Sequence, residues 1–75
     1  MDHKYMDQYI RLGQNITYYR EQRGYTRAEF ARRVGVSYGH LGNVEKARSG
    51  SSFYLLFLIA RELGIPVRKL VEPRD

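Results

Sequence analysis

Apolar residues recur along the chain at the spacing of amphipathic helices, and glycines separate one helical segment from the next. Phe30, Ala31 and Val34 follow the three- and four-residue steps of one helical face. Gly35 follows directly and permits the left-handed backbone conformation in which helices often end. The pattern predicts a short helix that starts after Thr26 and ends at this glycine.

A second short helix is expected over 38–45. Ser37 can cap it by accepting a hydrogen bond from a backbone N–H of the first turn, and Leu41 and Val44 are its inward positions. Two helices joined by three or four residues that include a glycine form the helix-turn-helix pattern. In that motif the second helix enters the major groove of DNA, so DNA binding is the first function to test.

Three further helices are expected around this pair, which makes the fold class all-α, a compact five-helix domain without strands. One helix spans about 7–23, the fourth runs from a serine cap at 51 or 52 to about 63, and a short fifth starts near Pro66. The expected inward residues of these three helices are Leu12, Ile16, Tyr19, Phe53, Leu56, Ile59 or Phe57, Ala60, Leu63, Val67 and Leu70.

Length and composition limit the remaining possibilities. The 75 residues suit one domain, which we expect over 9–72 with an N-terminal extension over 1–8 and a tail over 73–75. The chain has no cysteine, and neither His3 nor His40 has the companions of a metal site, so no metal or cofactor is expected. The longest apolar run is too short for a membrane span and the first residues are polar, so we expect a cytoplasmic protein.

Positive charge is concentrated in the candidate helix-turn-helix unit. The net charge of the chain is +5. Residues 20–48 carry seven basic and three acidic side chains, a net charge of +4, and the rest of the chain adds only +1. Such a cluster is what phosphate binding requires, although a solvated basic face without a partner is the alternative.

These elements resemble the Cro and phage-repressor helix-turn-helix family, also called the Xre family. The resemblance covers about residues 12–70 and implies a five-helix domain that binds operator DNA, usually as a two-fold dimer, to regulate transcription. It also implies an ion pair between Arg20 and Glu45. The residues that carry the resemblance are Leu12-Gly13, Ile16, Arg20, Gly24-Tyr25-Thr26, Glu29-Phe30-Ala31, Val34-Gly35-Val36-Ser37, Leu41, Val44-Glu45, Leu56, Ile59-Ala60, Leu63-Gly64-Ile65 and Leu70.

The chain departs from the family pattern at three places. Arg27 replaces a Gln that typically touches a phosphate and braces the recognition helix. Ala47 stands where a glycine often follows that helix, which suggests a different helix end. Gly39 and Gly42 lie within the recognition helix, where each costs about 1 kcal/mol relative to Ala and offers no side-chain contact.

Helical geometry places Tyr38, Gly39, Gly42 and Asn43 on the outward face of the helix over 38–45. Asn43 is the best candidate for reading a base, because its amide can pair with adenine through both a donor and an acceptor. Tyr38 could touch a phosphate or a thymine methyl, or pack against the preceding helix. We expect phosphate contacts, which position a protein without reading sequence, from Thr26, Arg27, Ser37, His40, Lys46, Arg48, Ser49 and Ser51.

An apolar patch is expected on the fourth helix, where Tyr54, Leu55 and Leu58 lie outside its inner stripe. Such a patch on a small protein suggests an interface, unless an N-terminal segment with Tyr5 and Tyr9 covers it. A second candidate interface, the usual dimer region of the family, consists of Val67, Leu70 and Val71.

The sequence therefore favours a DNA-binding regulator, a repressor acting as a homodimer on a palindromic operator. The alternative is a protein-interaction module that keeps the fold and uses the patch on the fourth helix. An enzyme is not expected, since the chain shows no paired carboxylates, nucleophile elbow or phosphate loop.

Overall fold

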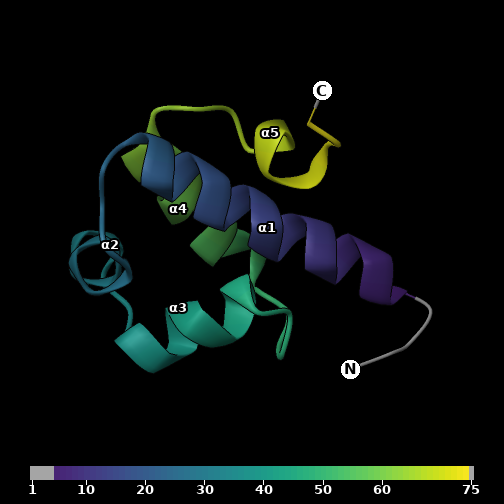
Figure 1. Ribbon diagram of the computed structural model, residues 1–75, viewed down its shortest axis with the longest axis horizontal. Helices are drawn as coiled ribbons and strands as arrows, with labels where there is room; N and C mark the ends of the chain where they lie inside the picture. Colours follow the sequence, from purple (N-terminus) through teal and green to yellow (C-terminus); the bar gives the residue numbers. More distant parts are fainter. Residues whose placement is uncertain (1–4, 75) are drawn as a thin grey trace.

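The structure of the chain is a computed structural model that describes residues 5–74 (Figure 1). The all-helical fold is confirmed: the regular secondary structure of the described residues consists of α1 (Met6–Gln22), α2 (Arg27–Val34), α3 (Tyr38–Glu45), α4 (Phe53–Leu63) and α5 (Arg68–Val71). Helix α1 starts within the segment assigned to the N-terminal extension. Residues 1–4 of that extension, with His3, and Asp75 of the expected tail lie outside the described residues.

Three of the five helices begin at the hydroxyl caps that the sequence indicates. Thr26 accepts from the backbone N–H of Glu29 at 3.1 Å, and Ser37 accepts from that of His40 at 3.0 Å. Ser52 caps α4 in the same way through Leu55. Each bond satisfies a backbone donor that has no partner within its helix, so the starts of these helices are fixed by local chemistry.

Helix α1 is the centre of the packing. Figure 1 shows α3 and α5 on opposite sides of α1, and α1 also packs against α4. The fully buried side chains come from all five helices, which gives a single hydrophobic core. They are Ile16, Phe30, Leu41, Val44, Ile59, Leu63, Leu70 and the polar Asn15.

The buried face of α4 differs from the predicted one. Leu55, Ile59, Ala60 and Leu63 are buried, whereas Phe53 is 66% exposed and Phe57 is 53% exposed. The segment is apolar almost all round from 53 to 60, so spacing within it could not select one face. Contact with the neighbouring helices decides the rotation of α4, and Leu55 belongs to the core.

A buried asparagine joins α1 to the C-terminal end of the described chain. The Asn15 amide nitrogen donates to the carbonyl oxygens of Leu70 at 3.0 Å and Glu72 at 2.8 Å, with a longer bond of 3.3 Å to Lys69. Its carbonyl oxygen accepts from Nε of Arg74 at 2.9 Å. Asn15 therefore satisfies the last carbonyls of α5, a role that sequence analysis did not assign to it.

Candidate nucleic-acid interface

The turn between α2 and α3 sets the direction of the helix that would meet DNA. Gly35 has a φ of 95°, and the backbone N–H groups of Gly35 and Val36 both bond to the carbonyl of Ala31. A glycine is favoured here because side chains disfavour this left-handed conformation. The chain then reverses within three residues and α3 starts at Tyr38.

Helix α3 presents a continuous exposed face. Tyr38 is 57% exposed, and Gly39, His40 and Asn43 are also exposed. Lys46, one turn after Asn43 and directly past the helix, is exposed on the same face. The prediction for Gly42 is wrong: it was expected on this face, but it is buried because the side chain of Arg27 lies over it.

Glu45 is the buried centre of a hydrogen-bond network behind this face. Its side chain is 1% exposed and accepts from Nε of Arg20 at 2.9 Å and from Nη2 of the same arginine at 3.2 Å. Thr17 donates to Oε1 at 3.0 Å, and Nε of Arg27 donates to the same oxygen at 3.2 Å. The pair implied by the family resemblance is thus present, and it ties α1, α2 and α3 together.

Arg27 replaces the bracing glutamine of the family and still braces α3. Burial acts to lower the pKa of its guanidinium, but the hydrogen bond and negative charge of Glu45 outweigh burial. With a smaller contribution from Tyr38, they raise the pKa of Arg27 above its ordinary value. The arginine links the start of α2 to both ends of α3, through Tyr38 at the first residue and Glu45 at the last.

Most of the basic side chains in 20–48 are engaged within the protein. Besides Arg20 and Arg27, Arg23 donates to the carbonyl of Leu63 at 2.6 Å. Arg33 lies 3.6 Å from Glu62 of α4 and 4.8 Å from the centre of the Tyr25 ring. Among the described residues of this segment, Arg32, Lys46 and Arg48 are the basic side chains that make neither an ion pair nor a side-chain hydrogen bond. Net charge therefore overstates the cationic surface available to DNA.

The hydroxyls expected to touch phosphates differ in how accessible they are. Those of Thr26 and Ser37 already accept the capping bonds, although both residues are exposed at helix N-termini. The Ser51 hydroxyl donates to the carbonyl of Ser52 at 3.1 Å. The Ser49 oxygen is buried and, within residues 5–74, has no hydrogen-bond partner, so it meets a phosphate only if its loop moves.

The loop after α3 starts with a left-handed residue despite the missing glycine. Ala47 has a φ of 59°, the one positive φ among the non-glycine residues that the structure describes. The N–H of Arg48 bonds to the carbonyl of Asn43 at 2.8 Å, which closes the helix end. Helix α3 thus ends with the same left-handed conformation that a glycine would adopt. Ala47 adopts it at a cost in free energy, because its Cβ disfavours this conformation.

Helix α4 carries an exposed aromatic patch, although its members differ from those expected. Tyr54 is 72% exposed, and the rings of Phe53 and Phe57 lie 4.9 Å apart on the same surface. Leu55 is only 5% exposed and Leu58 is half-buried, because α4 turns this side toward the core. Of the second expected interface, Leu70 is fully buried, Val67 is half-buried and Val71 is 49% exposed.

The aromatic patch on α4 is not covered by the described part of the N-terminal segment. Tyr9, a residue expected to fold over it, lies instead beside Gly50 in the loop before α4. Tyr54, Phe53 and Phe57 are exposed even when every described residue of the N-terminal segment is present. This patch is therefore open to another molecule, a second copy of the chain included.

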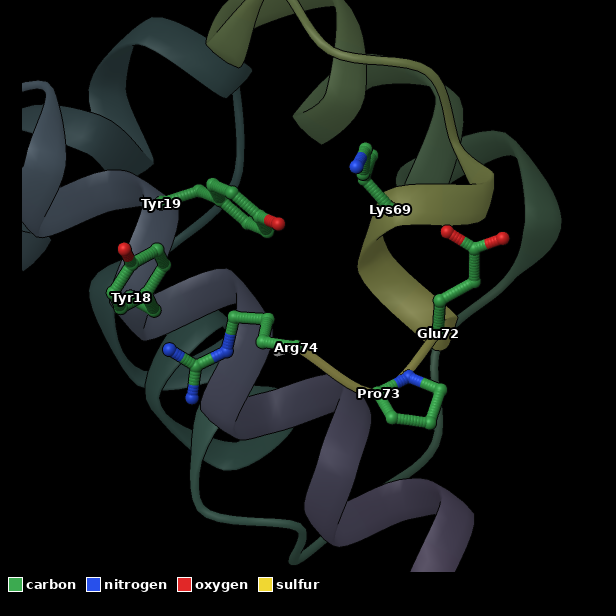
Figure 2. A pocket seen from close by; sticks show the side chains of 6 residues that line it. All are labelled: Tyr18, Tyr19, Lys69, Glu72, Pro73 and Arg74. Carbon is green, nitrogen blue, oxygen red and sulfur yellow. The ribbon is translucent and has the colours of Figure 1, made fainter.

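A pocket of about 370 Å³ lies between α1 and the C-terminal residues (Figure 2). Figure 2 shows the Arg74 guanidinium beside the Tyr18 ring, and the guanidinium carbon is 4.0 Å from the ring centre. Glu72, the acidic residue of the lining, bonds to Arg68 at 3.1 Å. The pocket therefore offers no pair of carboxylates for acid–base catalysis, and α5, which supplies one wall, lies across α1 from α3.

The geometry defines a DNA-binding domain of the helix-turn-helix class, and comparison with known proteins names its family. Residues 16–70 match the profile of the helix-turn-helix family, so the chain belongs to that family, in its Xre or phage-repressor form. The chain is a DNA-binding transcriptional regulator and not an enzyme. No helix in the described residues combines the length and apolar character needed to cross a membrane.

Relatives and solved structures agree with this assignment. The chain is 31% identical over 70 residues to the uncharacterized HTH-type transcriptional regulator y4dJ of Sinorhizobium fredii. This match covers 93% of the present chain and 91% of y4dJ. It is 29% identical over 65 residues to the HTH-type transcriptional regulator SinR of Bacillus licheniformis, covering 85% of this chain and 59% of SinR.

Two solved structures are similar over most of the domain. The restriction-modification controller protein C.AhdI from Aeromonas hydrophila has a TM-score of 0.85 at 24% identity, over 91% of this chain and 99% of that chain, which shows the shared fold. SinR, the master regulator for biofilm formation, solved in complex with DNA, has a TM-score of 0.77 at 29% identity over 81% of this chain and 98% of that chain.

Proposed function

We propose that this protein regulates transcription by inserting α3 into the major groove of a specific operator. The observation that carries the proposal is the exposed face of α3, which presents Tyr38, Asn43 and Lys46 from a helix that Glu45 anchors to the core. An anchored helix with a polar outer face can bind DNA without the loss of conformational entropy that ordering a flexible segment would cost. The similar SinR structure contains DNA, which supports the same use of the fold here.

Base reading falls to two side chains. Asn43 is exposed in the middle of α3, where its amide can make the paired donor and acceptor contact with adenine. Tyr38 stands at the first residue of the helix and can contact a base edge or a thymine methyl. Gly39 is exposed with open space around it, so the backbone can approach DNA closely there. Gly42 makes no base contact in this proposal, since Arg27 covers it.

Phosphate contacts would flank these readers on both sides. The N-termini of α2 and α3 direct free backbone N–H groups outward at Thr26 and Ser37, where the helix dipoles favour an anion. On the other side of α3, the side chains of Lys46 and Arg48 are exposed and unpaired, with Ser51 in the same loop. His40, exposed on α3, is a further phosphate contact.

We also propose that the protein acts as a homodimer on a palindromic site and represses. Two recognition helices enter the same side of the duplex when the half-sites lie about one helical turn apart, roughly 34 Å. The face that would join two copies is the aromatic patch on α4, formed by Phe53, Tyr54 and Phe57, because these three large apolar side chains are more than half exposed on a helix that has no DNA role in this proposal. A dimer seated on a promoter blocks access to it without any further contact.

The decisive experiment is selection from a random pool of double-stranded DNA, followed by measurement of wild type, Asn43→Ala and Gln14→Ala on the selected site. Gln14 is an exposed amide of α1 and is the matched control. We expect a palindromic consensus for wild type and Gln14→Ala, and loss of about fivefold or more in preference at one base pair per half-site for Asn43→Ala. Selection that enriches no sequence would contradict the proposal.

The second candidate function is a protein-interaction module that docks a different protein on the aromatic patch of α4. The exposure of Tyr54 and Phe57 favours it as much as it favours a dimer. Sedimentation of wild type and Phe57→Glu separates the two. A wild-type dimer that becomes monomeric in the variant supports the homodimer, whereas a monomeric wild type at every concentration on DNA and off it leaves the interaction module as the better account of the patch.

A further inference from the structure

Arg27 connects the buried ion pair to the exposed start of α3. Its Nε donates to Glu45 at 3.2 Å, and its guanidinium carbon lies 5.7 Å from the centre of the Tyr38 ring, within the range of a cation–π interaction. Its Cδ and Nη1 both lie 3.6 Å from the position that a Cβ on Gly42 would take. The side chain therefore runs along α3 from the last residue toward the first, through the space that a larger residue at 42 would occupy.

Glu45 and Tyr38, the two residues that Arg27 connects, differ in how tightly their side chains are held. The Glu45 carboxylate is 1% exposed and is held at the same time by Arg20 and Thr17, so it is a fixed point. Tyr38 is 57% exposed and turns about two side-chain bonds, and Arg27, itself 22% exposed in its side chain, lies against its ring. A fixed carboxylate thus positions the arginine, and the arginine restricts the tyrosine.

We propose that Arg27 is a positioning residue for sequence readout: anchored by Glu45, it holds the Tyr38 ring in the orientation in which Tyr38 reads its base pair. This inference rests on the proposed function, in which α3 enters the major groove. A contact from Arg27 to a phosphate alone would strengthen binding to every sequence equally. A positioning role instead makes the preference at one base pair depend on Arg27.

Substitution by lysine separates these two roles. Lysine keeps the positive charge, but its single ammonium cannot bond to Glu45 and at the same time present a planar cation to the Tyr38 ring. Arg27→Lys, Tyr38→Ala and the double variant are measured on the selected operator and on a set of operators with single base-pair changes. Arg32→Lys is the matched control, since Arg32 is an exposed arginine of the same helix without an ion pair in residues 5–74.

We expect Arg27→Lys to lower the preference at the base pair read by Tyr38 by about threefold to tenfold, the size of one cation–π or hydrogen-bond coupling, with the salt dependence of binding unchanged. In the Tyr38→Ala background the same substitution should change that preference by less than about twofold, because the coupling is already absent. Arg32→Lys should leave the preference at every base pair as in wild type.

Two results would overturn the inference. One is full retention of the wild-type preference in Arg27→Lys. The other is an equal loss of preference with and without Tyr38, which would mean that Arg27 reads DNA by itself. If Arg27→Lys does not melt cooperatively, Arg27→Met, which has neither a donor for Glu45 nor a cation for the Tyr38 ring, is judged by the same criteria. A wild-type protein without any sequence preference would instead refute the proposed function, so the two failures are distinguishable.

Discussion

Ala47 holds a left-handed backbone conformation at the point where α3 gives way to its loop. For a residue with a Cβ this conformation costs about 1–2 kcal/mol, and glycine avoids the cost. We expect Ala47→Gly to raise the free energy of unfolding by about 1 kcal/mol, which corresponds to roughly 4–8 °C in the melting temperature of a domain this size. Thermal unfolding followed by circular dichroism measures it.

The control for this prediction is Ala28→Gly. Ala28 is exposed within α2, where a glycine costs about 1 kcal/mol of helix stability. The two substitutions have the same chemistry and should shift the melting temperature in opposite directions. A lower melting temperature for both would show that the conformation of Ala47 carries no strain.

Two helical glycines should respond in opposite ways to the same substitution. A Cβ on Gly13 of α1 would overlap with the carbonyl group of Glu45 in α3, because the two helices approach closely there. A Cβ on Gly39 would meet nothing within 4 Å. We therefore expect Gly13→Ala to destabilise the fold by about 1–3 kcal/mol and Gly39→Ala to stabilise it by about 1 kcal/mol. Chemical denaturation measures both, and a destabilised Gly39→Ala would be evidence against this assignment.

At the scale of elements, Glu45 should matter far more to stability than Glu29. Removal of the Glu45 carboxylate leaves the buried guanidinium of Arg20 without its partner, a loss of about 3–5 kcal/mol at a deeply buried pair. Glu29 is half-buried near the start of α2 and makes no ion pair within the described residues. Glu45→Ala should therefore melt well below Glu29→Ala, and equal melting temperatures would refute the central role of the network.

The attachment of α5 depends on Asn15 in the same direct way. Asn15→Ala removes the donor that the carbonyls of Leu70 and Glu72 share. The loss of these hydrogen bonds should lower the free energy of unfolding by about 1–3 kcal/mol. Hydrogen exchange is the appropriate measurement, because we expect faster exchange at the amides of 68–72 than at those of α2 and α3. Uniformly faster exchange across all five helices would contradict a local attachment.

Sequence patterns predicted the elements well where local chemistry decides them. Glycines, hydroxyl caps and helical spacing placed all five helices within a few residues, and the family resemblance supplied the pair of Arg20 and Glu45. The buried face of α4 could not be read from 53–60, because an almost wholly apolar segment has no distinctive side. Gly42 was placed on the DNA face because a helical wheel considers one helix alone. The residue that covers Gly42 is Arg27, whose side chain comes from α2.

At the scale of the whole molecule, the difference between total and available charge sets the salt dependence of DNA binding. Four of the seven basic residues in 20–48 are engaged in bonds within the protein, which leaves Arg32, Lys46 and Arg48. Each phosphate neutralised contributes a slope of about −0.9 in a plot of log affinity against log salt. We expect a slope near −3 per bound chain from this segment.

A pair of variants checks that assignment. Lys46→Ala should make the slope shallower by about 1, whereas Arg33→Ala should change it little, because Arg33 faces Glu62 and the Tyr25 ring. Fluorescence anisotropy at a series of salt concentrations measures the slopes. Equal changes in the two variants would show that Arg33 also contacts DNA.

The contact between Asn15 and the residues around α5 has a consequence for how the chain is made. Asn15 and Glu72 are separated by 57 residues, and α1 also packs against α3 and α4. During synthesis α1 leaves the ribosome before the other four helices, and its buried asparagine lacks these carbonyl partners until α5 and Glu72 have been translated. The helix-turn-helix pair therefore emerges before the element that closes the fold, and the completed domain forms only after α5 has emerged.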